Sequence, residues 1–395
     1  TIVFIVMRML GEMAITHPGV RTFTEFSRAG LGDAAGFIAG WLYWYFWIVV
    51  VPIEAIAGAQ ILQQWINLPM WQIGLALMAV MTAVNLLSAR SYGEFEFWFS
   101  SIKVAAIVAF ILVAAAFAFG LTSPDGATFA NLTDHGGFAP KGWVPVVATV
   151  TTVFFSLVGA EITTVAAAES KDPEKAVVRM ATTITWRILL FYVVSLGLIV
   201  CVVAWPMVKP GESPFTLALN VMGFKWGSAV MSFIILTAVL SCLNSAVYVC
   251  SRVLHVMADR GDAPRWLAEV NSQRVPARSI LLGSLVGVIG VVIAIVSPNR
   301  VFAFLISTTG TVILFVYLMT AVAHVRLRRR HPETETKAVR VWLFPWLSYV
   351  TIGAMVAVLV AMAITPELAS QFYFSLLTLA VVVGSYYAFR RPRRR

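Results

Sequence analysis

The sequence predicts an all-α protein that crosses a membrane many times, and its composition and hydropathy pattern support this fold class. Of the 395 residues, 59% are hydrophobic and only 12% are charged, and the mean hydropathy is +0.85. A soluble domain carries about 25% charged residues. Apolar runs of about 20 residues, the length that crosses a bilayer as a helix, recur along the whole chain. Transmembrane β-strands would instead show alternating segments of about ten residues.

Short polar stretches divide the chain into eleven predicted spans, which we interpret as one transmembrane domain. The second and seventh spans are the longest, and the first is short. The predicted spans are residues 1–16, 35–64, 70–89, 97–121, 143–168, 186–206, 226–258, 280–297, 301–325, 343–364 and 371–390.

The distribution of basic residues predicts the orientation of these spans. A net charge of +10 could suggest a nucleic-acid partner, but the Lys and Arg residues gather in alternate loops and in the tail. Twenty of them fall on the side of the tail, and four fall on the other side (Lys141, Lys209, Lys225 and Arg300). Since basic loops stay in the cytoplasm, the pattern predicts a multi-pass membrane protein with a cytoplasmic C-terminus, partnered by lipid and not by nucleic acid.

The first predicted span begins abruptly. The chain starts with Thr1 inside an apolar run, and eleven spans with a cytoplasmic tail would place this end outside. A membrane protein that starts in the cytoplasm and keeps its first span needs one more span than this. We therefore expect a first span, and part of the next, to lie upstream of Thr1.

Cysteines, histidines and clustered aromatic residues carry little functional signal. Cys201, Cys242 and Cys250 lie in apolar segments, and neither they nor the five histidines have metal-site spacing. No metal or cofactor is implied. The aromatic residues at 41–47 resemble the belt that anchors spans at a bilayer surface, and we interpret most of them in that way.

Three charged residues lie inside predicted spans, where a charge at the bilayer centre costs at least about 2.5–3.5 kcal/mol. Glu54 follows Pro52, which removes a backbone donor from the helix. Its carboxylate either bonds a neighbouring helix or handles protons. Lys103 either extends to the bilayer surface or fills a cation site between helices, where a buried ammonium group can release its proton. Glu54, Lys103 and Glu161 are the candidates for proton coupling or a cation site.

The segment around Glu161 predicts a broken helix. Phe155, Ser156, Gly159 and Glu161 interrupt an apolar span near its middle, and glycine is a poor helix residue. Unwound backbone in a membrane is tolerated where it lines a cavity or is buried in protein. Transporters use such breaks to bind the charged ends of a substrate. These four residues are therefore candidates for substrate binding and gating, and the alternative is a kink that Glu161 stabilises.

Several motifs together resemble a known family. The chain is similar to the amino acid–polyamine–organocation superfamily, and within it to the bacterial amino acid transporters, over essentially its whole length. The motifs that carry this resemblance are MRMLGEMAITHP at 7–18, GWLYWYFWIVVVPIEA at 40–55, YGEFEFWFSSIKVAAIVAFI at 92–111, AAAESKDPEKAVVR at 166–179, SCLNSAVYVCSRVL at 241–254, DRGDAP at 259–264 and VWLFPWLSYVTIG at 341–353.

The resemblance implies a LeuT-type inverted-repeat fold of twelve helices, of which eleven are present. Residues 1–121 would form an incomplete first repeat, 143–325 the second repeat, and 343–390 two extra helices. By position, Phe155 resembles the aromatic gate over the substrate and Glu161 the acidic residue after the break. Lys103 resembles the lysine that replaces a sodium ion in some members. The implied function is proton-coupled uptake of GABA or a similarly small amino acid across the bacterial plasma (inner) membrane.

Four other interpretations stay open. The same fold could carry another amino acid, such as proline or an aromatic one. A membrane-embedded enzyme would need a nucleophile–base pair or metal ligands at helical spacing, and we find neither a His-Glu-x-x-His motif nor an aspartate pair in the spans. A sensor derived from a transporter, or a fragment without transport activity, would also fit a chain that lacks its first span.

Overall fold

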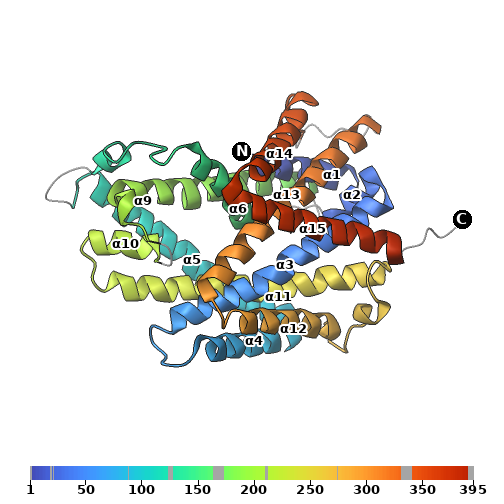
Figure 1. The fold of residues 1–395 in the computed structure, drawn as a ribbon, viewed down its shortest axis with the longest axis horizontal. Helices are drawn as coiled ribbons and strands as arrows, with labels where there is room; N and C mark the ends of the chain where they lie inside the picture. The colour runs from blue at the N-terminus through green and yellow to red at the C-terminus, as the bar shows by residue number, and fades with distance from the viewer. Residues whose placement is uncertain are drawn as a thin grey trace, which may run out of the picture. The chain divides into compact units, whose positions relative to one another are not determined.

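The structure is a computed structural model that describes residues 2–17, 20, 22–87, 89–122, 128–162, 173–209, 212–273, 275–330 and 340–389. Within this part, helices joined by loops make up the fold, and no strand occurs (Figure 1). In the described part of the chain, each predicted span contains helix, and residues 163–168 of the predicted span 143–168 lie outside that part. Eight helices among the described residues are long and apolar enough to cross a membrane. The all-α polytopic fold class is therefore confirmed.

The bounds of the spanning helices lie within a few residues of those predicted, except where a helix runs on into a loop or ends early. The predicted span 186–206 is a helix that continues through a π-helical turn, and the span 143–168 ends as regular helix at Leu157. The helices are α1 Ile2–Thr16, α3 Asp33–Leu62, α4 Met70–Leu87, α5 Ala89–Ala118, α6 Trp143–Leu157, α8 Pro173–Ile188, η2 Leu189–Val194, α9 Ser195–Val202, α11 Gly227–Asp259, α12 Ala277–Ile293, α13 Pro298–Arg330, α14 Trp346–Ile364 and α15 Pro366–Phe389.

Shorter helices lie in the connections between the spans. They are α2 Thr24–Leu31, α10 Pro214–Val221, and the 3-10 turns η1 Phe129–Leu132, η3 Trp205–Met207 and η4 Arg265–Ala268. Only α10 has a side-chain cap among these, where Ser213 Oγ accepts a hydrogen bond from the N–H of Thr216 at 3.4 Å. Such a cap satisfies one of the N–H groups that a helix start leaves unpaired.

The chain divides into two compact units, each of which collects segments that are distant in sequence. The first unit contains Thr1–Trp47, Val144–Thr185 and Ala303–Arg395, and the second contains Ile48–Trp143 and Trp186–Phe302. Each unit therefore draws residues from both predicted repeats. The boundaries of the repeats themselves stay a prediction.

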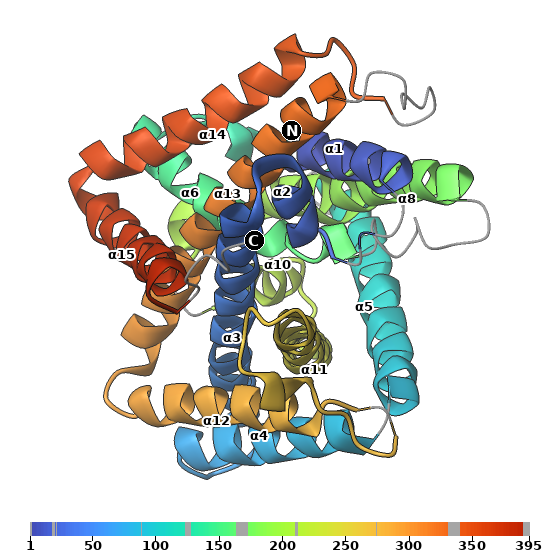
Figure 2. The same cartoon turned by 90° about the vertical axis from the view of Figure 1, so that its right-hand side faces the viewer.

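In the first unit, α14 packs against both α15 and α1. Figure 2 shows α14 and α15 joined at a sharp corner. Aromatic contacts connect these helices to the start of α3, since the rings of Phe37 and Tyr386 lie 5.3 Å apart. Helix α2 approaches α13 so closely that a side chain at Gly30 would meet the Cα of Ala323 at 2.8 Å. Glycine is the residue that permits this approach.

A buried ionic cluster ties α1 to the end of α13 in the same unit. Glu12 lies 3.1 Å from the Arg328 guanidinium and 3.3 Å from Nε2 of His324, and it accepts the N–H of Val341 at 2.8 Å. The Arg328 guanidinium also lies 4.1 Å above the ring of Phe344. The side chains of Glu12 and Arg328 are each only 5% exposed. Charges this deep in a protein are stable only when they are paired.

In the second unit, α11 is the central helix and packs against α4, α5, α10 and α12. Helices α4 and α12 run side by side (Figure 2). Pro52 lies inside α3 without ending it, and Gly290 of α12 leaves room for its ring, because a Cβ at Gly290 would stand 2.5 Å from that of Pro52. A buried hydrogen bond of 2.9 Å between Asn85 and Asn244 joins α4 to α11. In lipid, such polar contacts join helices where a hydrophobic driving force between them is absent.

Candidate functional site

The first candidate site is the interruption of α6, in the first unit. Helix α6 ends at Leu157, Val158 and Gly159 form a turn, and residues 160–162 are helical again. Gly159 has a φ of +108°, a conformation that side-chain-bearing residues rarely adopt. The interruption lies where the sequence predicts it. The regular helix of α6 is therefore broken at Val158 and Gly159.

The Glu161 carboxylate, which follows the turn, forms hydrogen bonds back across it. Its two oxygens accept the N–H of Gly159 at 3.1 and 2.9 Å, so the side chain reaches back across the turn. The hydroxyl of Tyr43 on α3 donates to Oε1 at 2.9 Å, and that of Tyr317 on α13 donates to Oε2 at 3.1 Å. Glu161 is fully buried. Three elements of the first unit thus meet at one carboxylate.

Aromatic rings surround the two tyrosines. Tyr43 packs edge-on against Phe23, with ring centres 4.5 Å apart, and Tyr317 lies 6.1 Å from Phe154 of α6. Both tyrosines are buried, so each phenol needs a hydrogen-bond partner, and Glu161 supplies it. The interpretation of residues 41–47 as a surface belt is therefore wrong for Tyr43, whose side chain is turned into the protein.

The other two predicted residues of this site with side chains are Ser156 and Phe155. The Ser156 hydroxyl donates to the carbonyl of Val153 at 3.0 Å, a bond within its own helix. Phe155 belongs to α6, but its side chain lies outside the described part, so its role as a gate stays a prediction.

Lys103 and Glu54 belong to a second cluster, in the second unit. Lys103 Nζ donates to Ser241 Oγ of α11 at 2.7 Å and lies 3.7 Å from Glu96 Oε1. Glu54 has the Cys242 thiol as its hydrogen-bond partner and Lys103 as a charged neighbour. The structure thus brings together two residues that the sequence nominates separately for proton coupling.

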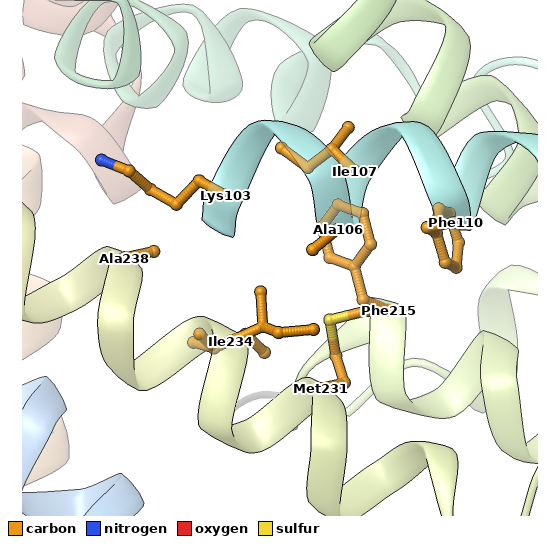
Figure 3. Close-up of a pocket in the computed structure, with 9 residues that line it drawn as sticks. Lys103, Ala106, Ile107, Phe110, Phe215, Met231, Ile234 and Ala238 are labelled. Atoms are coloured by element: carbon orange, nitrogen blue, oxygen red, sulfur yellow. The ribbon is translucent and has the colours of Figure 1, made fainter. Parts of the chain in front are cut away.

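An apolar pocket of about 150 Å³ lies beside this cluster, between α5 and α11. Lys103 stands at one end of it (Figure 3), and its ammonium group is directed away from the apolar side chains. The remaining lining is Ala106, Ile107, Phe110, Phe215, Met231, Ile234, Ile235 and Ala238. The ammonium group contacts Ser241 and lies near Glu96, and neither residue lines this pocket. The pocket therefore offers the lysine apolar packing only.

Sequence reasoning missed Tyr317, Glu96, Ser241 and Ser245 as partners in these two clusters. Tyr317 is a polar group within an apolar stretch of α13, and Glu96 lies seven residues before Lys103, on the same face of α5. Both patterns are visible in the sequence and could have nominated these residues. Ser241 and Ser245 of α11 are common small residues, and their contacts with Glu96 had no such signal.

Comparisons with known proteins agree with this architecture. The family model described as amino acid permease matches residues 1–395. The gamma-aminobutyric acid permease of Bacillus subtilis is 40% identical over 99% of this chain and 84% of its own length. That of Escherichia coli is 38% identical over 92% of this chain and 79% of its own length. The aromatic amino acid transport protein AroP of Escherichia coli is 34% identical over 98% and 85%.

Among solved structures, a manganese transporter of Eremococcus coleocola, crystallised with an aromatic bis-isothiourea substituted compound, resembles this chain. The TM-score is 0.56, and the match covers 97% of this chain and 84% of the other at 13% sequence identity. At that identity the likeness concerns the fold alone. It supports the LeuT-type architecture.

Proposed function

The chain belongs to the amino acid permease family, and from this premise we propose that it imports GABA or a similarly small amino acid together with protons. Transport of amino acids across a membrane is the activity of that family. The observation that carries the narrower proposal is the 40% identity to a gamma-aminobutyric acid permease over 99% of the chain, against 34% to an aromatic amino acid transport protein.

The interrupted helix offers groups that suit an amino acid. Helix α6 ends at Leu157, and the negative end of its dipole there attracts an ammonium group. Half-helix ends of this kind bind substrates in secondary transporters, and alternating access then rocks one part of the protein around the site. We place Phe155, Ser156, Gly159 and Glu161 at this site.

Family membership favours transport over the other interpretations. A membrane-embedded enzyme would need a nucleophile–base pair or metal ligands at helical spacing. The coupling ion follows from Lys103, because a lysine in the cation position carries a charge that a proton, and not sodium, adds or removes.

Uptake by purified protein in liposomes tests the substrate. With the interior alkaline, we expect labelled GABA to accumulate above its external concentration and a protonophore to abolish the accumulation. Unlabelled GABA should compete more strongly than proline or phenylalanine. Accumulation of phenylalanine or proline without competition by GABA would contradict GABA as the substrate. Accumulation that needs a sodium gradient and is unaffected by the protonophore would contradict coupling to protons.

We also propose that the C-terminus lies in the cytoplasm, because twenty Lys and Arg residues fall on its side and four on the other. A reporter fused after Arg395 should read as cytoplasmic, and one inserted in the loop at 125–137 as external. The same reporter at both positions provides the internal control. The reverse reading at either position would contradict this orientation.

A further inference from the structure

Ser241 connects Lys103 to Glu96 through a directed pair of hydrogen bonds. Its Oγ accepts from Lys103 Nζ at 2.7 Å and donates to the Glu96 carboxylate, whose two oxygens are each 2.7 Å away. Lys103 Nζ and Glu96 Oε1 are 3.7 Å apart, which is too far for a hydrogen bond. The hydroxyl is therefore the hydrogen-bonded link between the cation and this carboxylate.

We propose that Lys103, Ser241 and Glu96 form a proton relay, in which Glu96 accepts the proton that Lys103 releases. An N–H bond of the ammonium group breaks as its proton moves to Ser241 Oγ, and the original hydroxyl proton of Ser241 moves to a carboxylate oxygen of Glu96. Lys103 becomes a neutral amine, Glu96 a neutral acid, and Ser241 again carries one proton. The step deepens the proposed function, on whose proton coupling it rests.

Further hydroxyl groups extend the hydrogen-bond network beyond Glu96. Ser100 and Ser245 donate to Glu96 at 2.8 and 3.3 Å, and the hydroxyls of Ser245 and Tyr92 are 3.1 Å apart. From Lys103 to Tyr92, α5 rises about 16 Å at about 1.5 Å per residue. The network thus runs from inside the span to the start of α5, on the side where the basic residues predict the cytoplasm.

Glu96 lies on an open face of α5, together with Tyr92 and Ser100. Its side chain is 27% exposed and that of Lys103 is 28% exposed, while Ser241 between them is buried. A carboxylate that is partly open can pass its proton onward, whereas a sealed one could not.

Other titratable groups stand around the relay but do not replace Glu96. From α3, Glu54 bonds Cys242 of α11, and Lys103 acts on both electrostatically. From α11, Tyr248 stacks on Tyr92 with ring centres 4.0 Å apart, and from η2, Tyr192 lies near Cys242. Of these groups, Glu96 is the one that shares a hydroxyl with Lys103. Glu54 supplies a second negative charge beside the lysine, and the relay moves the proton away from it.

Liposome transport of GABA with a pH-sensitive dye inside tests the relay. Glu96→Gln removes the acceptor, and Ser241→Ala removes the hydroxyl, so both should slow GABA-dependent acidification and concentrative uptake. We expect at least a tenfold loss, since a positioned proton acceptor contributes on the order of 100-fold. Exchange of GABA across the membrane without a pH gradient should stay within about threefold, because it needs no net proton release. Ser241→Thr restores a hydroxyl and should recover the dye signal.

Glu94→Gln is the matched control, since Glu94 is an exposed carboxylate two residues away on α5, and it should behave as the wild type. Normal acidification in Glu96→Gln would overturn the relay. Equal losses of exchange and accumulation, or a Ser241→Thr variant as impaired as Ser241→Ala, would overturn it too, since both indicate a packing role. Wild-type exchange without any acidification would instead remove the proton coupling on which the relay rests.

Discussion

Replacement of Glu161 by glutamine is expected to abolish concentrative uptake while the protein still reaches the membrane at normal levels. Glutamine keeps the shape and one carbonyl oxygen for the Gly159 N–H, and its amide can pair with the hydroxyls of Tyr43 and Tyr317. What it loses is the charge and the ability to carry a proton. Uptake of labelled substrate and the amount of protein in the membrane are the two measurements.

Exchange of substrate between two compartments separates the possible roles of Glu161. If its carboxylate carries the coupled proton, exchange should survive better than net uptake in the glutamine variant. Full accumulation by that variant would reduce Glu161 to a residue that stabilises a kink. Failure to insert, or degradation, would show that its packing outweighs its part in transport.

Truncation of Glu161 to alanine provides the contrasting control. Alanine leaves the Tyr43 and Tyr317 hydroxyls and the Gly159 N–H without their acceptor, and each unsatisfied buried group costs about 1–3 kcal/mol. We therefore expect the alanine variant to be unstable where the glutamine variant is not. Tyr317→Phe removes one donor and should fall between them in stability.

The positions of the helices could be predicted because the bilayer imposes a simple length and hydropathy rule on the sequence. The interruption at Gly159 was also visible, since a glycine followed by an acid in an apolar run conflicts with a continuous helix. Both are local properties. Neither depends on which helix becomes the neighbour of which.

The partners of the buried charges could not be predicted, because they depend on which helices become neighbours. Glu161 bonds tyrosines 118 and 156 residues away along the chain. Tyr43 stands among aromatic residues whose composition suits a bilayer surface equally well, so only the packing of α3 decides its direction. Glu54 bonds Cys242 and Lys103 bonds Ser241, both on α11, a helix whose small residues resemble ordinary packing positions.

The buried ion pair between Glu12 and Arg328 also joins residues that are distant in sequence, and its contribution to stability can be measured. Removal of one partner of a buried ion pair costs about 3–5 kcal/mol, because the other charge is left buried without compensation. Arg328 contacts Glu12 at 3.1 Å and Phe344 at 4.1 Å, so its loss affects α1, α13 and the segment before α14 together. His324 Nε2 also lies 3.3 Å from Glu12.

Arg328→Met is therefore expected to lower the unfolding temperature of the purified protein by several degrees, which a thermal melt in detergent would measure. Methionine keeps the apolar contact with Phe344 and removes only the charge and its donors. Adding Glu12→Gln should recover more than half of the loss, since glutamine still accepts the N–H of Val341 but leaves no charge to compensate. Arg326→Met, an exposed arginine on the same helix, is the matched control and should melt like the wild type. A double variant whose loss of stability equals or exceeds the sum of the two single losses would show that the arginine and the glutamate do not act as a pair.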